Sequence, residues 1–159
     1  MIISSAVMVR LQRAAVDEMD RQAVRAYPRE CCGVVVSVAG ADEVRPITNI
    51  QDRLHAEDPV ENPRDATIAY YMDPKELYTV LRESEDLGHS IRVFYHSHPD
   101  HGAYFSTEDE ARAMAWDEPA YPDACYLVLS VVGGSVKERL AVAWDARARK
   151  FSPIDVSID

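Results

Sequence analysis

Two unbroken apolar runs constrain the fold of this chain more than any other feature of its sequence. Val34–Val36 is β-branched throughout, and residues 124–132 (ACYLVLSVV) hold a single serine among apolar residues. β-Branched and aromatic residues favour strands. Both runs therefore predict buried strands, and we expect the longer one at the centre of a sheet.

Four other strands are expected to complete this sheet. They are placed at 43–50, 67–72, 90–98 and 137–144. Gly133–Gly134 predicts a tight turn that joins 124–132 to 137–144 as a hairpin. Residues 149–157 fit either a last strand or a loose tail.

Three helices are expected to pack on the sheet. Apolar residues recur every four positions through 11–27, as in an amphipathic helix. Asp73 as N-cap and Pro74 at the first helical position predict a helix that ends at Gly88. The third helix is placed at 106–117. The order of elements differs from a regular βαβ winding, so we predict one mixed α/β (α+β) domain over residues 1–159.

The segment 51–66 is polar and contains Pro59 and Pro63. Polar stretches with prolines are typical of surface loops, which often carry function. We therefore expect a mobile loop here that faces the substrate as a flap.

Composition excludes several classes of partner. The formal net charge of the 159 residues is −10, which argues against binding to nucleic acid or an anionic membrane. No apolar run approaches the roughly 20 residues of a membrane span, and residues 1–13 lack the basic start of a signal peptide. The three cysteines, Cys31, Cys32 and Cys125, make a poor disulfide framework and indicate a reducing cytoplasm.

The stretch 94–109, FYHSHPDHGAYFSTED, carries the densest chemistry. His96 and His98 lie two residues apart near a strand end, so both side chains face the same side. Ser106 and Asp109 have the spacing of a capping box at a helix start. Taken alone, the serine and aspartate favour a cap, and the histidines a surface or hydrogen-bonded pair.

Together these residues can form a metal site. A short loop from the strand end to the helix start can bring His96, His98 and Asp109 within about 2 Å of one point, the distance zinc requires. Three protein ligands plus water are the pattern of catalytic zinc. The site needs a base, and Glu30 is a candidate, because a carboxylate just before a buried strand has little structural reason to be there. Glu108 and Glu110 are expected to face away.

The pattern His96-Ser97-His98-Pro99, six residues, then Ser106-x-x-Asp109 resembles the JAMM (MPN+) metalloprotease motif. The segment Pro28-x-Glu30-x-Cys32-Gly33 is similar to the glutamate segment of that family. Asn49 and the segment Tyr71-Met72-Asp73-Pro74 also resemble family features. The resemblance covers most of the chain, and its long spacing is more specific than a short motif.

The resemblance implies a single MPN-like domain with a mixed, curved sheet flanked by helices. It implies that His96, His98 and Asp109 bind Zn²⁺, that Glu30 is the general acid/base that activates the zinc-bound water, and that Ser106 stabilises the oxyanion. It also implies hydrolysis of a peptide or isopeptide bond after the C-terminal Gly-Gly of a ubiquitin-like or sulfur-carrier protein. Exposed strand edges allow a homodimer.

The alternative is a non-catalytic MPN scaffold that binds partner proteins. Such scaffolds typically lack one or more of the five positions that are filled here. Cys32 has no recognisable base nearby, so Cys31 and Cys32 are expected to be small buried groups near the site. His101 has no assigned role, Tyr104 and Phe105 fit either core or a substrate channel, and Trp116 and Trp144 are expected in the core.

Overall fold

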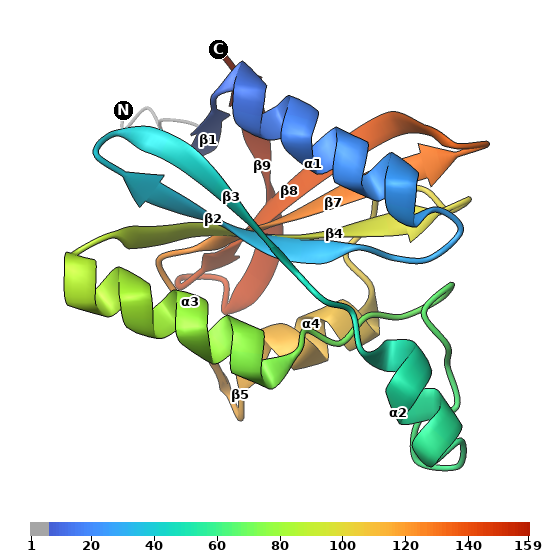
Figure 1. Ribbon diagram of the computed structural model, residues 1–159. Coiled ribbons are helices and arrows are strands. Elements are labelled where there is room, and N and C mark those ends of the chain that lie inside the picture. Colours follow the sequence, from blue (N-terminus) through green and yellow to red (C-terminus); the bar gives the residue numbers. More distant parts are fainter. Residues whose placement is uncertain (1–6) are drawn as a thin grey trace.

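The computed structural model describes residues 7–159, and its strands form a seven-stranded mixed sheet in the order β1-β9-β8-β7-β4-β2-β3. The pairs β1–β9 and β4–β7 are parallel, and the other pairs are antiparallel. Figure 1 shows that the sheet twists strongly. The strands are β1 (Met8–Leu11), β2 (Cys32–Val38), β3 (Ala41–Ile47), β4 (Ser90–Pro99), β7 (Cys125–Val132), β8 (Ser135–Asp145) and β9 (Lys150–Ile158).

Helices cover both faces of this sheet. Helix α1 (Arg13–Ala26) lies on one face, and α3 (Pro74–Leu87) and α4 (Thr107–Ala113) lie on the other (Figure 1). Helix α2 (Gln51–Glu57) lies beyond the sheet, on the side of α4. The expected fold class, a mixed curved sheet flanked by helices, is confirmed.

The central strand β7 is buried on both faces, as its apolar sequence predicts. Leu127 and Leu129 pack in the core beneath α1, while Tyr126 packs in the second core with Phe94. Alternation along a strand sends successive side chains to opposite faces. Two separate cores, one on each side of the sheet, follow from that alternation.

The ends of α3 also match their prediction. The Asp73 side chain accepts hydrogen bonds from the backbone N–H groups of Lys75 and Glu76. Gly88 ends the helix in the left-handed conformation, with φ of 70°. A glycine adopts that conformation without a Cβ penalty.

Two predicted segments are wrong. The expected loop 51–66 begins with α2, because the Asn49 side-chain oxygen accepts the Gln51 N–H at the helix start and helix formers follow. The expected strand 67–72 is reduced to an isolated bridge between Asn49 and Met72. The Asn49 side chain donates to the Ala69 carbonyl and accepts the Tyr71 N–H, and the Ile50 N–H donates to the Tyr71 carbonyl. These backbone groups would otherwise bind to a neighbouring strand.

The structure adds a strand before α1, decides between the two alternatives for 149–157, and differs from expectation after α4. Strand β1 precedes α1 and pairs with β9, so 149–157 is a strand rather than a tail. Helix α4 ends early, and a two-stranded hairpin of β5 (Met114–Ala115) and β6 (Glu118–Pro119) follows. This turn leaves Trp116 98% exposed instead of in the core, whereas Trp144 packs on Phe151.

Two expectations concern segments that might meet a membrane. The first six residues of the segment 1–13, on which the signal-peptide prediction was made, lie outside the described residues. Among residues 7–159, no helix combines the length and apolar character needed to cross a bilayer.

Gly33 provides a test of how β2 packs against β4. It lies directly opposite Tyr95, and a Cβ at Gly33 would fall 2.2 Å from the Tyr95 hydroxyl oxygen. Tyr95 is fully buried, so its ring has little room to move. We expect Gly33→Ala to lower the free energy of unfolding by about 1–3 kcal/mol, as overpacking does. Urea denaturation is the measurement.

Gly102→Ala is the matched control, because nothing lies within 4 Å of a Cβ at that position. Its free energy of unfolding should stay within about 0.5 kcal/mol of the wild type. Equal effects of the two substitutions would contradict this description of the β2–β4 contact.

Candidate metal centre

The histidine pair lies on strand β4, between β2 and β7. His96 pairs with Cys32 on one side and with Val128 on the other, which fixes its position within the sheet. His96 and His98 are buried, and their Nε2 atoms lie 3.1 Å apart. The predicted placement of both imidazoles on one face is confirmed, and α4 packs on that same face.

Asp109 reaches the histidines from the first turn of α4. The predicted capping box is present: the Ser106 hydroxyl oxygen accepts the Asp109 N–H, and Asp109 Oδ2 accepts the Ser106 N–H, both at 3.0 Å. The same Oδ2 lies 3.1 Å from His96 Nε2 and 3.4 Å from His98 Nε2. The cap therefore aims the carboxylate at the histidine pair.

These three atoms fit a zinc ion. Ligand bonds of about 2.0–2.1 Å at tetrahedral angles place two ligand atoms about 3.3 Å apart. The observed separations are 3.1, 3.1 and 3.4 Å. A single cation can therefore contact His96, His98 and Asp109 together while a fourth position stays open.

The protonation states also suit a metal. His98 Nδ1 lies 3.1 Å from the Gly102 carbonyl oxygen, so a proton on Nδ1 would leave Nε2 with a free lone pair. Burial lowers the pKa of His96 and favours the neutral ring. Burial works to raise the pKa of Asp109. Without a metal, the Nε2 atoms of His96 and His98 can instead carry protons and donate to this carboxylate, and together with the Ser106 N–H they keep the pKa of Asp109 well below its usual range. A metal would take the place of those Nε2 protons.

Glu30 lies across from this triad, in the segment that leads into β2. A carboxylate oxygen of Glu30 lies within 4.8 Å of the histidine ligand atoms, so by distance Glu30, His96 and His98 are a second possible ligand set. The shorter distances to Asp109 favour Asp109 as the third ligand and leave Glu30 beside the open position.

Backbone contacts fix the position of Glu30. Its N–H donates to the Ala66 carbonyl at 2.7 Å, and its carbonyl accepts from Asn49 Nδ2 at 2.9 Å. Ser97, which faces away from the histidines as expected, accepts the Cys31 N–H on its hydroxyl oxygen at 2.8 Å. Within residues 7–159, the Glu30 carboxylate itself receives no hydrogen bond, so it is available to a ligand or water.

Burial raises the pKa of Glu30 to about 9, and the nearby charge of Asp109 adds to the effect. A cation held by the triad would lower that pKa again, because opposite charge favours the carboxylate. The protonation of Glu30 therefore depends on whether the site carries a metal.

Ser106 is half-buried beside Glu30, His98 and Asp109 at a cavity of about 250 Å³. Its oxygen accepts in the capping box, and no acceptor for its hydroxyl hydrogen occurs in the described part of the chain. A hydroxyl can accept and donate at once. Ser106 can therefore cap α4 and still donate to a group in the cavity.

Sequence reasoning missed two side chains in the wall of this cavity. The Tyr70 ring stacks on His96 with ring centroids 4.4 Å apart, and the Arg112 guanidinium lies 5.6 Å from the Tyr70 centroid. Arg112 is one helical turn after Asp109, which is a weak signal for a shared face. Tyr70 carries no such signal, because its position depends on distant contacts of Asn49.

Glu108 also lines the cavity, contrary to expectation, whereas Glu110 is exposed and lies outside the cavity. Glu108 pairs with Arg64 at 2.5 Å and with Arg112 at 3.3 Å. The Arg64–Glu108 pair connects the 58–66 segment to α4, whereas the Glu108–Arg112 pair lies within α4. The role of 51–66 as a substrate flap stays a prediction.

The other predicted residues divide clearly. Tyr104 is 51% exposed and lines the cavity edge-on to His98, while Phe105 packs in the core against Tyr126. His101 is exposed at the cavity rim. The three cysteines, Cys31, Cys32 and Cys125, are buried and free, as expected.

Comparisons with known proteins identify the family and the fold of this chain. Residues 12–147 match the family of prokaryotic homologs of the JAB domain. A desampylase from Haloferax volcanii is 34% identical over 107 residues, which cover 67% of this chain and 66% of the relative. The aligned part thus spans just under two thirds of that relative.

Two solution structures share the fold. A Desulfitobacterium hafniense protein matches with a TM-score of 0.68 and 19% identity, over 96% of this chain and 93% of that one. A Salinibacter ruber protein matches with a TM-score of 0.60 and 21% identity, over 95% and 92%. The family match and the fold define a domain of the JAB/MPN class. The chain belongs to the prokaryotic JAB family, the JAMM/MPN group.

The pKa of Glu30 gives a pH dependence to the metal-free protein. Because the folded-state pKa of about 9 exceeds the ordinary 4.5, the folded state binds this proton more tightly. The resulting stability is fully present below pH 4.5 and is lost as the pH rises toward 9. Urea unfolding of chelator-treated protein should show this loss.

Glu30→Gln cannot titrate and is the control for this measurement. The difference in free energy of unfolding between variant and wild type should grow in favour of the variant as the pH rises from about 5 to 9. A difference that does not change with pH would contradict the description of Glu30 as a buried, raised-pKa carboxyl.

Proposed function

We propose that this chain is a zinc-dependent peptidase or isopeptidase. Its reaction would be hydrolysis of the amide bond that follows the C-terminal Gly-Gly of a ubiquitin-like or sulfur-carrier protein. The observation that carries the proposal is the convergence of His96, His98 and Asp109 on one point, with Glu30 across from them. The similarity to a desampylase supports hydrolysis at a ubiquitin-like protein.

His96, His98 and Asp109 are the proposed zinc ligands. When bound, zinc polarises the scissile carbonyl and lowers the pKa of water to about 7. Glu30 then takes the proton of the attacking water as general base. As the C–N bond breaks, Glu30 delivers that proton to the nitrogen, which leaves as a neutral amine.

Ser106 donates its free hydroxyl hydrogen to the carbonyl oxygen as negative charge develops there. Since its cap role uses a lone pair, this donor is held in place before the substrate arrives. The cavity has a volume of about 250 Å³, and glycines have no side chain that it would need to hold. A Gly-Gly end is therefore the kind of peptide that reaches these residues.

A non-catalytic scaffold is the less supported function. A scaffold has no use for a buried carboxyl beside a buried histidine pair, because burial of an unpaired acid is costly. The buried, free cysteines fit a reducing compartment, and we place the protein in the cytoplasm.

We expect purified protein to hold about one zinc per chain, in line with three-ligand sites. Asp109→Ala should lose the metal, because it removes the oxygen that lies closest to both histidines. Glu110→Ala, an exposed neighbour on the same helix, should keep it. Elemental analysis by mass spectrometry measures this. The wild type is purified without chelators and then given zinc. If it still holds no metal, the ligand assignment is contradicted.

Glu30→Gln should keep its zinc and lose hydrolysis by about 10²–10⁴, the usual contribution of acid–base catalysis. Ser106→Ala should keep zinc and lose about 10²–10³, as for other oxyanion donors. The assay follows, by mass, a Gly-Gly-ended carrier protein that is extended by a few residues or loaded with cysteine. Glu110→Gln is the matched control. Full activity of Glu30→Gln would remove Glu30 from the mechanism.

A further inference from the structure

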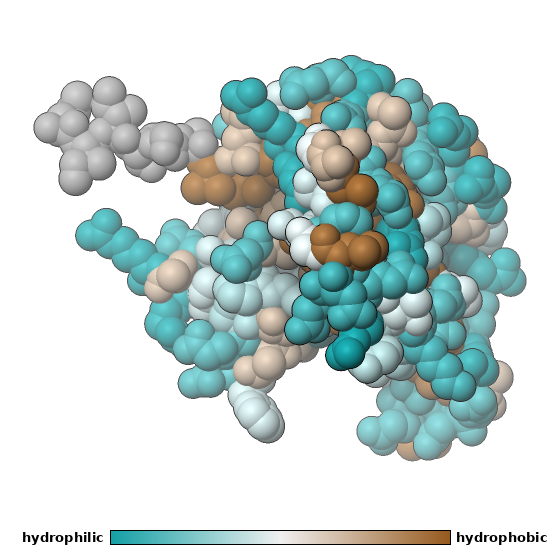
Figure 2. All heavy atoms as spheres, turned by 60° about the vertical axis from the view of Figure 1, so that its left-hand side comes forward, coloured by the Kyte–Doolittle hydropathy of each residue, from teal (hydrophilic) through white to brown (hydrophobic). Residues whose placement is uncertain are grey.

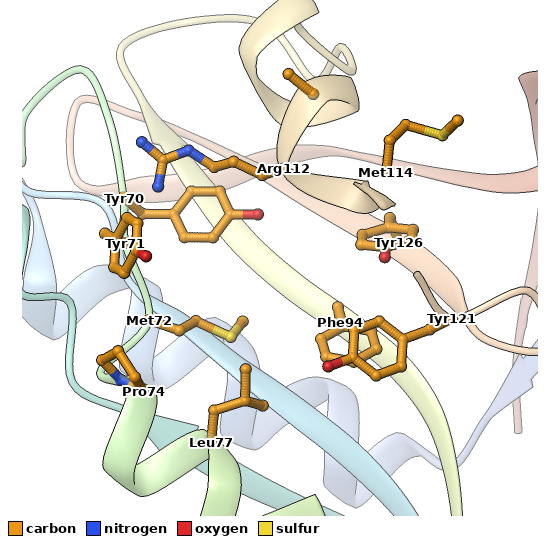
Figure 3. Close-up of a pocket in the computed structure, with 11 residues that line it drawn as sticks. Tyr70, Tyr71, Met72, Pro74, Leu77, Phe94, Arg112, Met114, Tyr121 and Tyr126 are labelled. Carbon is orange, nitrogen blue, oxygen red and sulfur yellow. The ribbon is translucent and has the colours of Figure 1, made fainter. Parts of the chain in front are cut away.

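A second cavity lies between α3 and α4, on the same face of the sheet as the histidines. Its volume is about 420 Å³, within the roughly 300–1,000 Å³ of ligand pockets. In Figure 3, Phe94, Tyr121 and Tyr126 line one side of it, opposite Tyr70 and Tyr71, and Leu77 points into it from α3. The cavity is therefore an apolar, aromatic site next to the proposed metal centre.

The two cavities share a wall. Tyr70 and Arg112 line both of them. The Tyr70 ring stacks on His96, and the Arg112 guanidinium lies over the rings of Tyr70 and Tyr71, 5.6 and 5.0 Å from their centroids. One aromatic ring and one guanidinium therefore separate the reacting centre from the apolar cavity.

The lining defines the chemistry of the occupant. Among the described residues that line the cavity, Arg112 carries the one charge. A large apolar side chain would fill the interior, and the main-chain carbonyl oxygens of the same peptide would meet the Arg112 donors. Guanidinium N–H groups are donors without acceptor capacity, so the match is to oxygen.

We propose that this cavity binds a large apolar side chain, such as leucine or phenylalanine, from the last few residues before the Gly-Gly end of the substrate. The inference rests on the proposed function and makes it more specific. A tail that extends about 3.3 Å per residue crosses the Tyr70–Arg112 wall within a few residues. The cavity would thus select the carrier by its tail.

Figure 2 shows hydrophilic residues over most of one face, with hydrophobic residues in small, separate patches. The cavity between α3 and α4 gathers apolar and aromatic side chains beside the proposed metal centre. A carrier with one apolar tail residue matches it.

Substrate tails give the first test. A carrier is made with leucine moved through each of about four positions before Gly-Gly, with alanine at the others. We expect one position where leucine raises kcat/KM by about 10- to 100-fold over alanine, as burial of one such side chain allows. Equal kcat/KM for all tails, in an active enzyme, overturns the inference and leaves the proposed hydrolase intact.

Variants of Leu77 give the second test, because it lines the apolar cavity and not the metal cavity. Leu77→Ala enlarges the cavity and should shift the preference from leucine toward phenylalanine or tryptophan. Leu77→Trp fills it and should reduce the leucine-to-alanine ratio to about one. Leu87, 67% exposed at the end of the same helix, is the control, and its alanine and tryptophan variants should keep the wild-type ratio. Unchanged ratios in both Leu77 variants overturn the inference.

A binding measurement separates this inference from the proposed function. Methionine methyl groups are ¹³C-labelled in Glu30→Gln, and tail peptides with leucine or alanine are added. Met72 and Met114 line the cavity and should shift with the leucine peptide, while Met19, a buried residue of α1 in the other core, should not. No shift overturns the inference. A shift with 3-phenylpropionate but not with the peptide also overturns it, because the occupant is then a free aromatic acid.

If no tail is cleaved by the zinc-loaded wild type, the proposed hydrolase fails. The methionine shifts then decide the occupant of the cavity independently of that failure.

Discussion

One oxygen atom, Oδ2 of Asp109, joins the helix that carries it to the strand that carries the histidines. It accepts the Ser106 N–H and lies within 3.4 Å of both Nε2 atoms. The capping box that begins α4 therefore also holds a carboxylate against the histidine pair. Since Asp109 is buried, this position is stable only because hydrogen bonds compensate its desolvation. The proposed ligand set, the place of Glu30 and the donor role of Ser106 all depend on it.

Longer-range contacts supply the other half of the site. Cys31 and Ser97 are joined by two hydrogen bonds, from the Cys31 N–H to the Ser97 hydroxyl and from the Ser97 N–H to the Cys31 carbonyl. These bonds hold the residue next to Glu30 against strand β4. Asn49 binds the Glu30 carbonyl and also the segment that carries Tyr70, which stacks on His96. One amide side chain thus positions the proposed base and the wall behind the histidines. The same wall connects the metal cavity to the apolar cavity, so catalysis and tail selection would share residues.

The sequence predicts the parts of this arrangement that follow local rules. Strand alternation places His96 and His98 on one face, and the spacing from Ser106 to Asp109 predicts the cap. The missed parts depend on partners far along the chain. Residues 67–72 look like a strand, but the Asn49 side chain takes the place of a strand partner. Trp116 is a large aromatic residue and is therefore expected in the core, but the short hairpin of β5 and β6 exposes it to solvent. No local pattern places Arg112 beside Tyr70.

The central claim is that zinc binds to the two imidazoles and the Asp109 carboxylate. X-ray absorption at the zinc edge of the wild-type protein tests it most directly. The account predicts nitrogen and oxygen ligands at about 2.0–2.1 Å with scattering from two imidazole rings. A sulfur ligand at about 2.3 Å, which would bring in Cys31 or Cys32, or scattering from fewer than two imidazoles, would contradict it.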